Sequence, residues 1–401
     1  MNGVYWLEWL NLLGRWVHLI TGIAWIGASF YFVWLDNHLL PPQNPADADN
    51  KSIGGEVWSV HGGGFYHAQK YRVAPDVLPE PLHWFKWEAY TTWLSGFFML
   101  ALMYYVGADS YLIDPAVLTL SPLQAIAIGI ATLTLGWLIY DGLCRSPLGR
   151  DDRLLGLAVL VMITLAAWGL THLFSGRGAY IHFGAMLGTL MVANVFFVII
   201  PGQRELIKAK LAGRETDPTP GLKAKQRSVH NTYFTLPVLF SMMSNHYAMV
   251  FSHTYNWLLL VLISVAGAAI RMYFVARHKG RATLFPLLLG IALLACVAYA
   301  TAPPPAPAPI AIANPAAEFA RVVSVVQARC ASCHAALQTQ PGFAAAPKGV
   351  MLDTPARVAA QATPIYQQVQ SRAMPLGNLT GMTEVERQLI LNWHAAGAHT
   401  Q

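Results

Sequence analysis

Two cysteines and a histidine near the C-terminus have the spacing of a covalent haem site. Residues 330–334 read Cys-Ala-Ser-Cys-His, the C-x-x-C-H pattern of c-type haem attachment. Thiols three residues apart on a helical turn can form thioethers to both haem vinyl groups, and the adjacent imidazole can bind the iron. A redox dithiol or half of a zinc site is the alternative, but no second pair of ligands lies nearby in the sequence. We therefore expect Cys330, Cys333 and His334 to hold one haem c.

The second axial ligand of a cytochrome c of this size is normally a methionine, which raises the reduction potential. Met351, Met374 and Met382 are the candidates. Met374 precedes Pro375 in a loop that contains glycine and proline, and this loop resembles the distal loop of small bacterial cytochromes c. We expect Met374 to bind the haem iron and Met351 to pack in the loop at the haem edge.

Ionisable side chains within apolar segments are a second group of candidates, because polar groups at membrane depth are costly and often functional. His18, His172, His182 and His246 are expected in the half of the chain's membrane region that lies on the cytochrome's side. Arg15 lies one turn before His18 and shares its helix face. Such histidines could bind a b-type haem between helices, or they could form part of a substrate site.

A substrate site of this kind would suit a polar or anionic molecule. Arg15 or Arg271 could be the counter-ion, while a histidine accepts a proton. Arg15, His18 and His182 are our candidates for catalytic residues. The plain alternative is that histidines near the ends of spans merely lie at the level of the lipid headgroups.

The loop after the first apolar segment is unusual, because aromatic residues and histidines surround three consecutive glycines. Residues 58–71 read Trp-Ser-Val-His-Gly-Gly-Gly-Phe-Tyr-His-Ala-Gln-Lys-Tyr. Glycines permit close approach of the backbone to a ligand or to another helix. A re-entrant segment or a substrate vestibule is as consistent with this pattern as a purely structural packing role.

The elements that must position these residues are membrane helices. Hydrophobic residues make up 55% of the 401 residues and charged residues only 11%, against about 25% charged in an ordinary soluble domain. Apolar stretches of about 20 residues, long enough to cross a bilayer, recur until about residue 301. We predict an all-α fold, in which a polytopic membrane helix bundle of about eight spans precedes a small all-α cytochrome c domain. The predicted spans are 6–34, 86–107, 122–142, 153–173, 180–201, 229–249, 255–277 and 283–301.

The basic residues indicate how the bundle is oriented. The net charge of +6 does not indicate nucleic-acid binding, because the basic residues fall between the apolar spans. If the N-terminus faces outward, Arg177 is alone in the outward loops, and the inward loops hold the other lysines and arginines between spans, Lys51 and Arg281 among them. An even number of spans returns the C-terminus to the outside, where haem c is attached. We expect a bacterial inner-membrane protein with a periplasmic N-terminus and cytochrome domain, and no removable signal peptide, because Met1–Leu13 lacks a basic leader and a cleavage site.

The composition divides the chain into three parts. Residues 1–301 form the transmembrane domain, and the Pro/Ala-rich residues 302–315 should form a semi-rigid linker. Residues 316–401 form the soluble cytochrome c domain. Its last helix is expected to begin at Thr383, with Glu386 three positions later.

The chain resembles the bacterial integral-membrane urate oxidase family, an eight-span domain fused to a C-terminal cytochrome c. The resemblance covers the whole chain and is carried by residues 14–18 (Gly-Arg-Trp-Val-His), 25–27 (Trp-Ile-Gly), 61–66, 228–237 and 244–247 (Ser-Asn-His-Tyr). It implies hydroxylation of urate to 5-hydroxyisourate, with electrons passed to the chain's own c-type haem. A downstream cytochrome c or terminal oxidase would then receive them.

The chemistry of that reaction constrains where it can occur. Oxidative hydroxylation removes two electrons and needs a base, a positioned water molecule and an acceptor, and a single haem accepts one electron at a time. Because electron transfer weakens quickly with distance, we expect the urate site in the outer half of the bundle, or else a b-type haem that bridges the membrane. The alternative function is a non-catalytic respiratory electron carrier that conducts electrons from quinol to the cytochrome.

Overall fold

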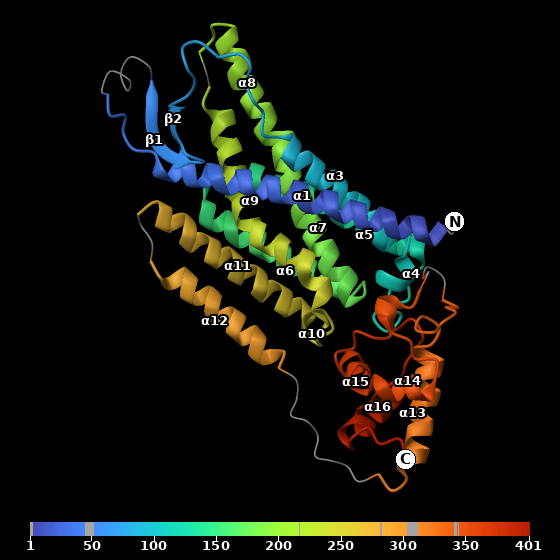
Figure 1. The fold of residues 1–401 in the computed structure, drawn as a ribbon. Helices are drawn as coiled ribbons and strands as arrows, with labels where there is room; N and C mark the ends of the chain where they lie inside the picture. The colour runs from blue at the N-terminus through green and yellow to red at the C-terminus, as the bar shows by residue number, and fades with distance from the viewer. Residues whose placement is uncertain are drawn as a thin grey trace.

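The computed structural model describes residues 3–44, 52–215, 217–280, 283–302, 312–340, 343 and 345–401, with side chains from Tyr5 onward. Long helices pack side by side in one bundle, and a small helical domain lies against one end of it (Figure 1). The predicted all-α class is confirmed. Most of the predicted linker, together with Lys51 and Arg281, lies outside the described residues.

Each predicted span falls on a helix of the bundle. Within the described ranges, five helical segments are long and apolar enough to cross a membrane: Tyr5–His38, Pro122–Arg145, Asp152–Thr171, Gly176–Leu211 and Asn256–His278. The long helices are α1 (Gly3–His38), α3 (Trp87–Leu100), α5 (Pro122–Arg145), α6 (Asp152–Thr171), α7 (Gly176–Asn194), α9 (Thr219–Met243), α11 (Asn256–His278) and α12 (Phe285–Ala300). The shorter helices are α4 (Ala108–Tyr111), η2 (Pro147–Arg150), α8 (Ile200–Leu211), η4 (Ser244–His246) and α10 (Ala248–Phe251).

The sixth predicted span differs most from its helix. We placed it at 229–249, whereas α9 begins at Thr219 and ends at Met243. Residues 219–228 are helical too, but they are polar, so a search for apolar spans did not include them. Pro237 lies inside α9 without ending it.

Local sequence signals set several helix ends. The Ser121 side chain accepts a hydrogen bond from the Gln124 N–H, and the Gln124 side chain bonds back to Ser121, so that a capping box starts α5. Asp151 and Ser175 cap α6 and α7 in the same way, with their side-chain oxygens accepting backbone N–H groups of the first turn.

Two π-helical turns interrupt the regular helices. The turn η1 (Ala101–Tyr105) continues α3, and the Val106 N–H donates to the Ala101 carbonyl at 2.9 Å. The turn η3 (Val195–Ile199) joins α7 to α8. A π-turn adds one residue to a helical turn, and such insertions often occur at functional sites.

The glycine-containing loop forms a β-hairpin. Strands β1 (Ile53–His61) and β2 (Gly64–Tyr71) pair in antiparallel register, with His61 opposite Gly64. Gly62 and Gly63 have φ values of +58° and +81°, as a two-residue hairpin turn requires at both central positions. No heavy atom lies within 4 Å of a Cβ built on either glycine, so these residues serve the turn rather than a close approach of another helix.

The C-terminal domain (residues 314–401) has its own apolar core. Its helices are α13 (Pro315–Arg329), η5 (Pro347–Gly349), α14 (Pro355–Ala360), α15 (Ala362–Gln370), η6 (Leu376–Asn378) and α16 (Glu384–Ala395). Trp393 is fully buried and its ring stacks on Phe319 at 5.5 Å between centroids. Thr383 and Glu386 form the predicted capping box of α16.

The C-terminal domain packs against α4 through the loop that contains η6. A Cβ on Gly377 would lie 3.1 Å from the Ile113 carbonyl oxygen and 3.3 Å from that of Ser110. Arg387 interacts electrostatically with Asp114, whose pKa is raised by burial and lowered in part by this arginine. We call this end of the bundle the docked end and the opposite end, where β1 and β2 lie, the hairpin end (Figure 1).

Candidate functional site

The C-x-x-C-H segment forms a tight turn after α13. The His334 N–H donates to the Cys330 carbonyl at 2.9 Å, and the Cys333 N–H donates to the same carbonyl at 3.2 Å. The His334 Nδ1 lies 2.9 Å from the Val350 carbonyl oxygen. Because a carbonyl only accepts, Nδ1 carries the proton and Nε2 is left as the nitrogen that can bind a metal.

The two thiols of this turn are weaker acids than an ordinary cysteine. Burial raises the pKa of the Cys330 thiol to about 12, and burial also raises the pKa of Cys333. A redox-active dithiol instead has a cysteine whose pKa is lowered. The described residues contain no group of three or more His, Cys, Asp or Glu side chains that could hold a metal ion.

The three candidate methionines have different surroundings. Met382 is 3% exposed and belongs to the apolar core of the domain, so its sulfur is committed to packing. Met374 is half-buried, and its backbone is held at both ends: its N–H donates to the Gln368 carbonyl, and its carbonyl accepts from Arg387 Nη1 at 2.9 Å. Met351 is also half-buried. A fixed loop with a partly exposed thioether is consistent with Met374 as the second iron ligand.

A polar cluster lies inside the docked end of the bundle. The Tyr104 hydroxyl donates to Asn245 Oδ1 at 2.8 Å, and Arg177 Nε donates to the same oxygen at 3.1 Å. The Arg177 guanidinium also lies over the ring of Tyr111, a residue of α4, at 5.0 Å. These residues come from η1, α7, η4 and α4, so the cluster connects the interior of the bundle with the surface on which the C-terminal domain docks.

His182 lies next to this cluster and is fully buried. Its Nδ1 is 2.9 Å from the Gly178 carbonyl oxygen, which requires the proton on Nδ1 and leaves Nε2 as an acceptor. Among the residues that the structure describes, neither His182 Nε2 nor the buried Tyr105 hydroxyl has a hydrogen-bond partner. A Cβ on Gly129 would lie 2.7 Å from Nε2 and 3.0 Å from that hydroxyl. The two unpaired atoms thus converge on one point beside the α5 backbone.

His18 and Arg15 lie between α1 and α3. His18 Nδ1 is 3.0 Å from the Thr92 carbonyl oxygen, and its ring packs so closely on Gly96 that a Cβ there would lie 2.8 Å from Cε1. Arg15 is exposed and donates to Asn11 Oδ1 at 2.6 Å, and it is close enough to Tyr104 for an electrostatic interaction.

The structure does not gather the four predicted histidines into one cluster. His172 and His246 are exposed at helix ends, and the His172 ring packs on Trp168 at 4.6 Å. His18 packs against α3 from the α1 side, whereas His182 lies on α7, and α3 has contacts with both of these helices. His18 and His182 thus come from two different helices, α1 and α7, that both pack against α3.

A second polar network lies in the hairpin half of the bundle. Arg227 Nη2 donates to Asp141 Oδ1 at 2.7 Å, and Arg227 Nη1 donates to Asn194 Oδ1 at 3.2 Å. The Tyr140 hydroxyl lies 2.7 Å from His230 Nδ1 and accepts from Asn194 Nδ2 at 3.1 Å. Sequence reasoning missed this network and Arg177, although a single polar residue within an apolar span, such as Asn194, was the available signal.

The family comparison matches this helix bundle. The model of the family described as Urate oxidase N-terminal matches residues 4–302, about three quarters of the chain. The chain belongs to this family. The match of the Urate oxidase N-terminal family covers α1 to α12 and ends before the C-terminal domain. A search of curated proteins found no match, and neither did a search of solved structures.

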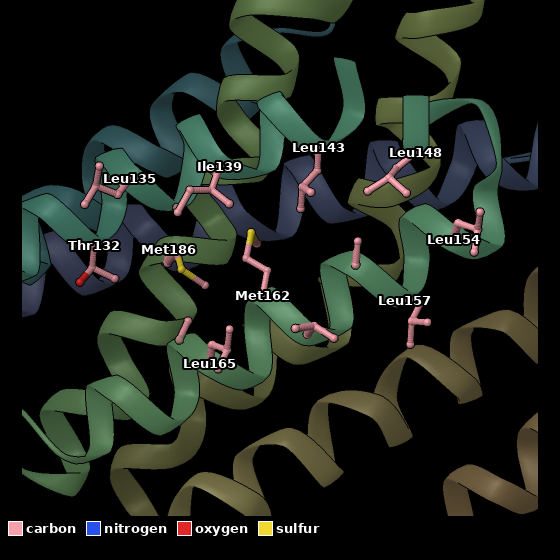
Figure 2. A pocket seen from close by; sticks show the side chains of 14 residues that line it. Thr132, Leu135, Ile139, Leu143, Leu148, Leu154, Leu157, Met162, Leu165 and Met186 are labelled. Atoms are coloured by element: carbon pink, nitrogen blue, oxygen red, sulfur yellow. The ribbon is translucent and has the colours of Figure 1, made fainter. Parts of the chain in front are cut away.

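One groove of this urate oxidase-related bundle is lined almost entirely by apolar side chains. It has a volume of about 790 Å³ and lies between α5 and α6, with Leu135, Ile139, Leu157 and Met162 among the residues that line it (Figure 2). A purine with polar edges needs hydrogen-bond partners, and among the lining residues only Thr132 has a polar side chain. The polar clusters inside the bundle are therefore the better candidates for a urate-related function.

Proposed function

We propose that the chain oxidises urate to 5-hydroxyisourate in its helix bundle and passes the electrons to a haem c in its C-terminal domain. The urate monoanion and one water molecule give neutral 5-hydroxyisourate, one proton and two electrons. The C4–C5 region of the purine is oxidised as a C5–O bond forms, and the haem is reduced twice, once by each electron. A downstream cytochrome c or terminal oxidase would reoxidise it.

The observation that carries this proposal is the contact between the two parts of the chain. The loop with Gly377 follows Met374 directly and packs against Ser110 and Ile113 at the docked end. The helix α4 in turn follows η1, which bears Tyr104 and Tyr105. An electron acceptor in the C-terminal domain would therefore lie beside the polar cluster of the bundle.

Haem c would be held by thioethers to Cys330 and Cys333 and by His334 and Met374 as axial ligands, and it would supply one-electron acceptance. The chain's own residues prepare that site. Val350 fixes the His334 ring through its carbonyl oxygen, and Arg387 holds the Met374 backbone.

His182 is our candidate for the general base. Its Nε2 is an acceptor, is buried, and is free of protein partners, which is the state required to take a proton from the attacking water. The Tyr105 hydroxyl faces the same point and would orient that water or the substrate. His18, whose Nδ1 is paired with the Thr92 carbonyl, would be a second proton acceptor.

Urate is an anion at neutral pH, and cations near the docked end would balance its charge. Arg177 belongs to the polar cluster, and Arg15 is within electrostatic reach of Tyr104. A b-type haem in the bundle stays a prediction, and the haem count described below tests it.

We further propose that the bundle spans the bacterial inner membrane with the docked end outside. Lysines and arginines gather at the hairpin end, where α8 ends and α9 begins, as at a cytoplasmic face. Arg177 is at the docked end. This orientation would place the C-terminal domain in the periplasm, where haem c is attached.

The test is anaerobic addition of urate to the purified full-length protein while the absorption of reduced haem c is followed. We expect urate to reduce the haem. When an external acceptor reoxidises the haem, two electrons per urate should reach that acceptor, together with formation of 5-hydroxyisourate. A pyridine haemochrome spectrum counts c-type and b-type haems in the same sample. Haem reduction by quinol but not by urate would contradict the proposal and would favour the non-catalytic electron carrier.

A further inference from the structure

Arg271 is a buried cation without a hydrogen-bond partner on one edge. It lies on α11 and is 7% exposed, and its Nε and Nη2 atoms are both buried and unpaired. Removing a charged group from water without pairing it is costly, so such a residue in an apolar bundle needs compensation. Within the described part of the chain, no salt bridge involves Arg271, and the ring of Phe30 lies 3.8 Å from its guanidinium carbon.

The two unpaired nitrogens form one edge of the guanidinium. On that edge the Nε–H and one Nη2–H point in the same direction, which suits two parallel hydrogen bonds to a planar oxyanion. Phe30 covers one flat face through a cation–π contact, and the two unpaired N–H groups lie in the plane of the guanidinium, so a ligand that accepts from both lies in that plane. The unpaired edge is therefore suited to a flat anion with two neighbouring acceptor atoms.

The surroundings are suited to an anion. Tyr233 of α9 is near enough to interact electrostatically with Arg271, and a phenol can donate a further hydrogen bond. Arg271 lies about one turn beyond the middle of α11 toward the hairpin end, on the other side of the bundle's midpoint from His182. The residues Phe30, Tyr233 and Arg271 bring together α1, α9 and α11.

We propose that Arg271 binds the urate anion edge-on, in a capture site between α1, α9 and α11 that is separate from the His182 point. This inference rests on the proposed function for the identity of the anion. A urate oxygen and an adjacent ring nitrogen provide the paired acceptors, and the purine lies in the plane of the guanidinium. The site lies in the half of the bundle opposite the C-terminal domain.

The test is direct binding of radiolabelled urate to the full-length protein by anaerobic equilibrium dialysis, with the haem reduced beforehand so that no turnover occurs. The variants are Arg271→Gln and Arg271→Lys. The matched control is Arg277→Gln, which removes an exposed arginine from the same helix. We expect urate binding at least about tenfold weaker in Arg271→Gln, intermediate in Arg271→Lys, which keeps the charge but not the paired donors, and unchanged in the control.

Steady-state kinetics and a second anion complete the test. We expect Arg271→Gln to raise KM for urate more than it lowers kcat, as loss of a capture site requires. Wild-type urate binding by a folded Arg271→Gln protein would overturn the inference while the proposed function stood. If Arg271→Gln lost the binding of benzoate but kept the binding of urate, the choice of urate as the anion would be overturned. Arg271-dependent urate binding without any urate-dependent haem reduction would support this site and contradict the proposed function instead.

Discussion

Gly377 of the C-terminal domain fits so closely against Ile113 of the bundle that a Cβ would lie 3.1 Å from the Ile113 carbonyl oxygen. The backbone φ of Gly377 is +55°, in the left-handed region that glycine adopts without strain. The contact is therefore limited to glycine by two independent requirements, space and conformation.

Gly377→Ala should weaken docking of the C-terminal domain. The new methyl group would press on backbone carbonyl oxygens that cannot move aside, in addition to a left-handed strain of about 1 kcal/mol. Gly381→Ala is the matched control, because its φ is +65° but nothing lies within 4 Å of its Cβ. We expect slower urate-dependent haem reduction and faster proteolytic release of the domain in Gly377→Ala than in Gly381→Ala. Equal behaviour of the two variants would argue against the docked contact.

Met374→Ala should lower the reduction potential of the haem without preventing its attachment. A thioether ligand raises the potential, while attachment depends on Cys330 and Cys333. Redox titration and a haem stain of the denatured chain measure the two effects. Met351→Ala is the control and should leave the potential nearly unchanged. A lowered potential in Met351→Ala alone would identify Met351 as the ligand.

Gly129→Ala should block the point on which His182 Nε2 and the Tyr105 hydroxyl converge, since its Cβ would lie 2.7 Å from Nε2. We expect the rate of urate oxidation to fall by about 100-fold or more, as on loss of a general base. The rate of the His182→Gln variant should fall by a similar factor. Gly142→Ala on the same helix has open space around its Cβ and should retain activity. Rates are compared with haem reduction by a small-molecule reductant, which should stay normal. Activity near the wild-type level in His182→Gln would exclude the imidazole as the base.

These sites show what could be predicted from sequence. Hydropathy and capping signals predicted the helices. The spacing of Cys330, Cys333 and His334 predicted a turn, and the structure contains one there. His182 was selected by its depth in an apolar segment, and it is indeed fully buried. The sequence indicates how far along a span a residue lies, but not whether its side chain points into the bundle or away from it. His172 and His246 were therefore grouped with His182, although they are exposed.

Other features depended on packing between distant segments. The π-turn at Ala101–Tyr105 shifts the helix face by one residue, and no simple periodic pattern marks it. Partners such as Asp141 and Arg227 are 86 residues apart, so their pairing follows only from how α5 and α9 pack. The glycines at 62 and 63 proved to be turn residues, which the flanking Val60 and Phe65 in alternating strands could have indicated.

Asp141→Ala should destabilise the bundle strongly. It would leave the Arg227 guanidinium, 5% exposed, without its carboxylate, and loss of one partner of a buried pair costs about 3–5 kcal/mol. Arg145→Ala removes the exposed partner of the same carboxylate, with 69% of its side chain accessible, and should change the free energy of unfolding by about 1 kcal/mol or less. Thermal unfolding in one detergent compares the two. Similar midpoints for both variants would contradict the importance of the buried pair.

Acid should destabilise the C-terminal domain through Glu386. Burial would raise the pKa of this carboxyl, but hydrogen bonds from Arg329 and Thr383 outweigh it and hold the pKa below the ordinary 4.5. A lowered folded-state pKa stabilises the domain fully above about pH 4.5, and this contribution is lost as the pH falls through the folded value. Glu386→Gln should be less stable at neutral pH and lose less stability in acid.

Circular dichroism of the haem region during an acid titration measures this difference. Glu384→Gln is the control, because that carboxylate is 68% exposed and pairs with Arg372 at the surface. A Glu386→Gln domain with the same acid sensitivity as the parent would show that other carboxyl groups dominate the titration.

The domain that packs against α4 through Gly377 belongs to the same polypeptide as the bundle, and this determines how often the two parts meet. A domain carried on the same polypeptide meets its docking surface by a unimolecular step, with an effective concentration fixed by the connecting segment. Dilution therefore cannot separate the pair, and the frequency of contact does not depend on how much of the protein a cell makes. A freely diffusing carrier would instead have to find the bundle by a second-order collision.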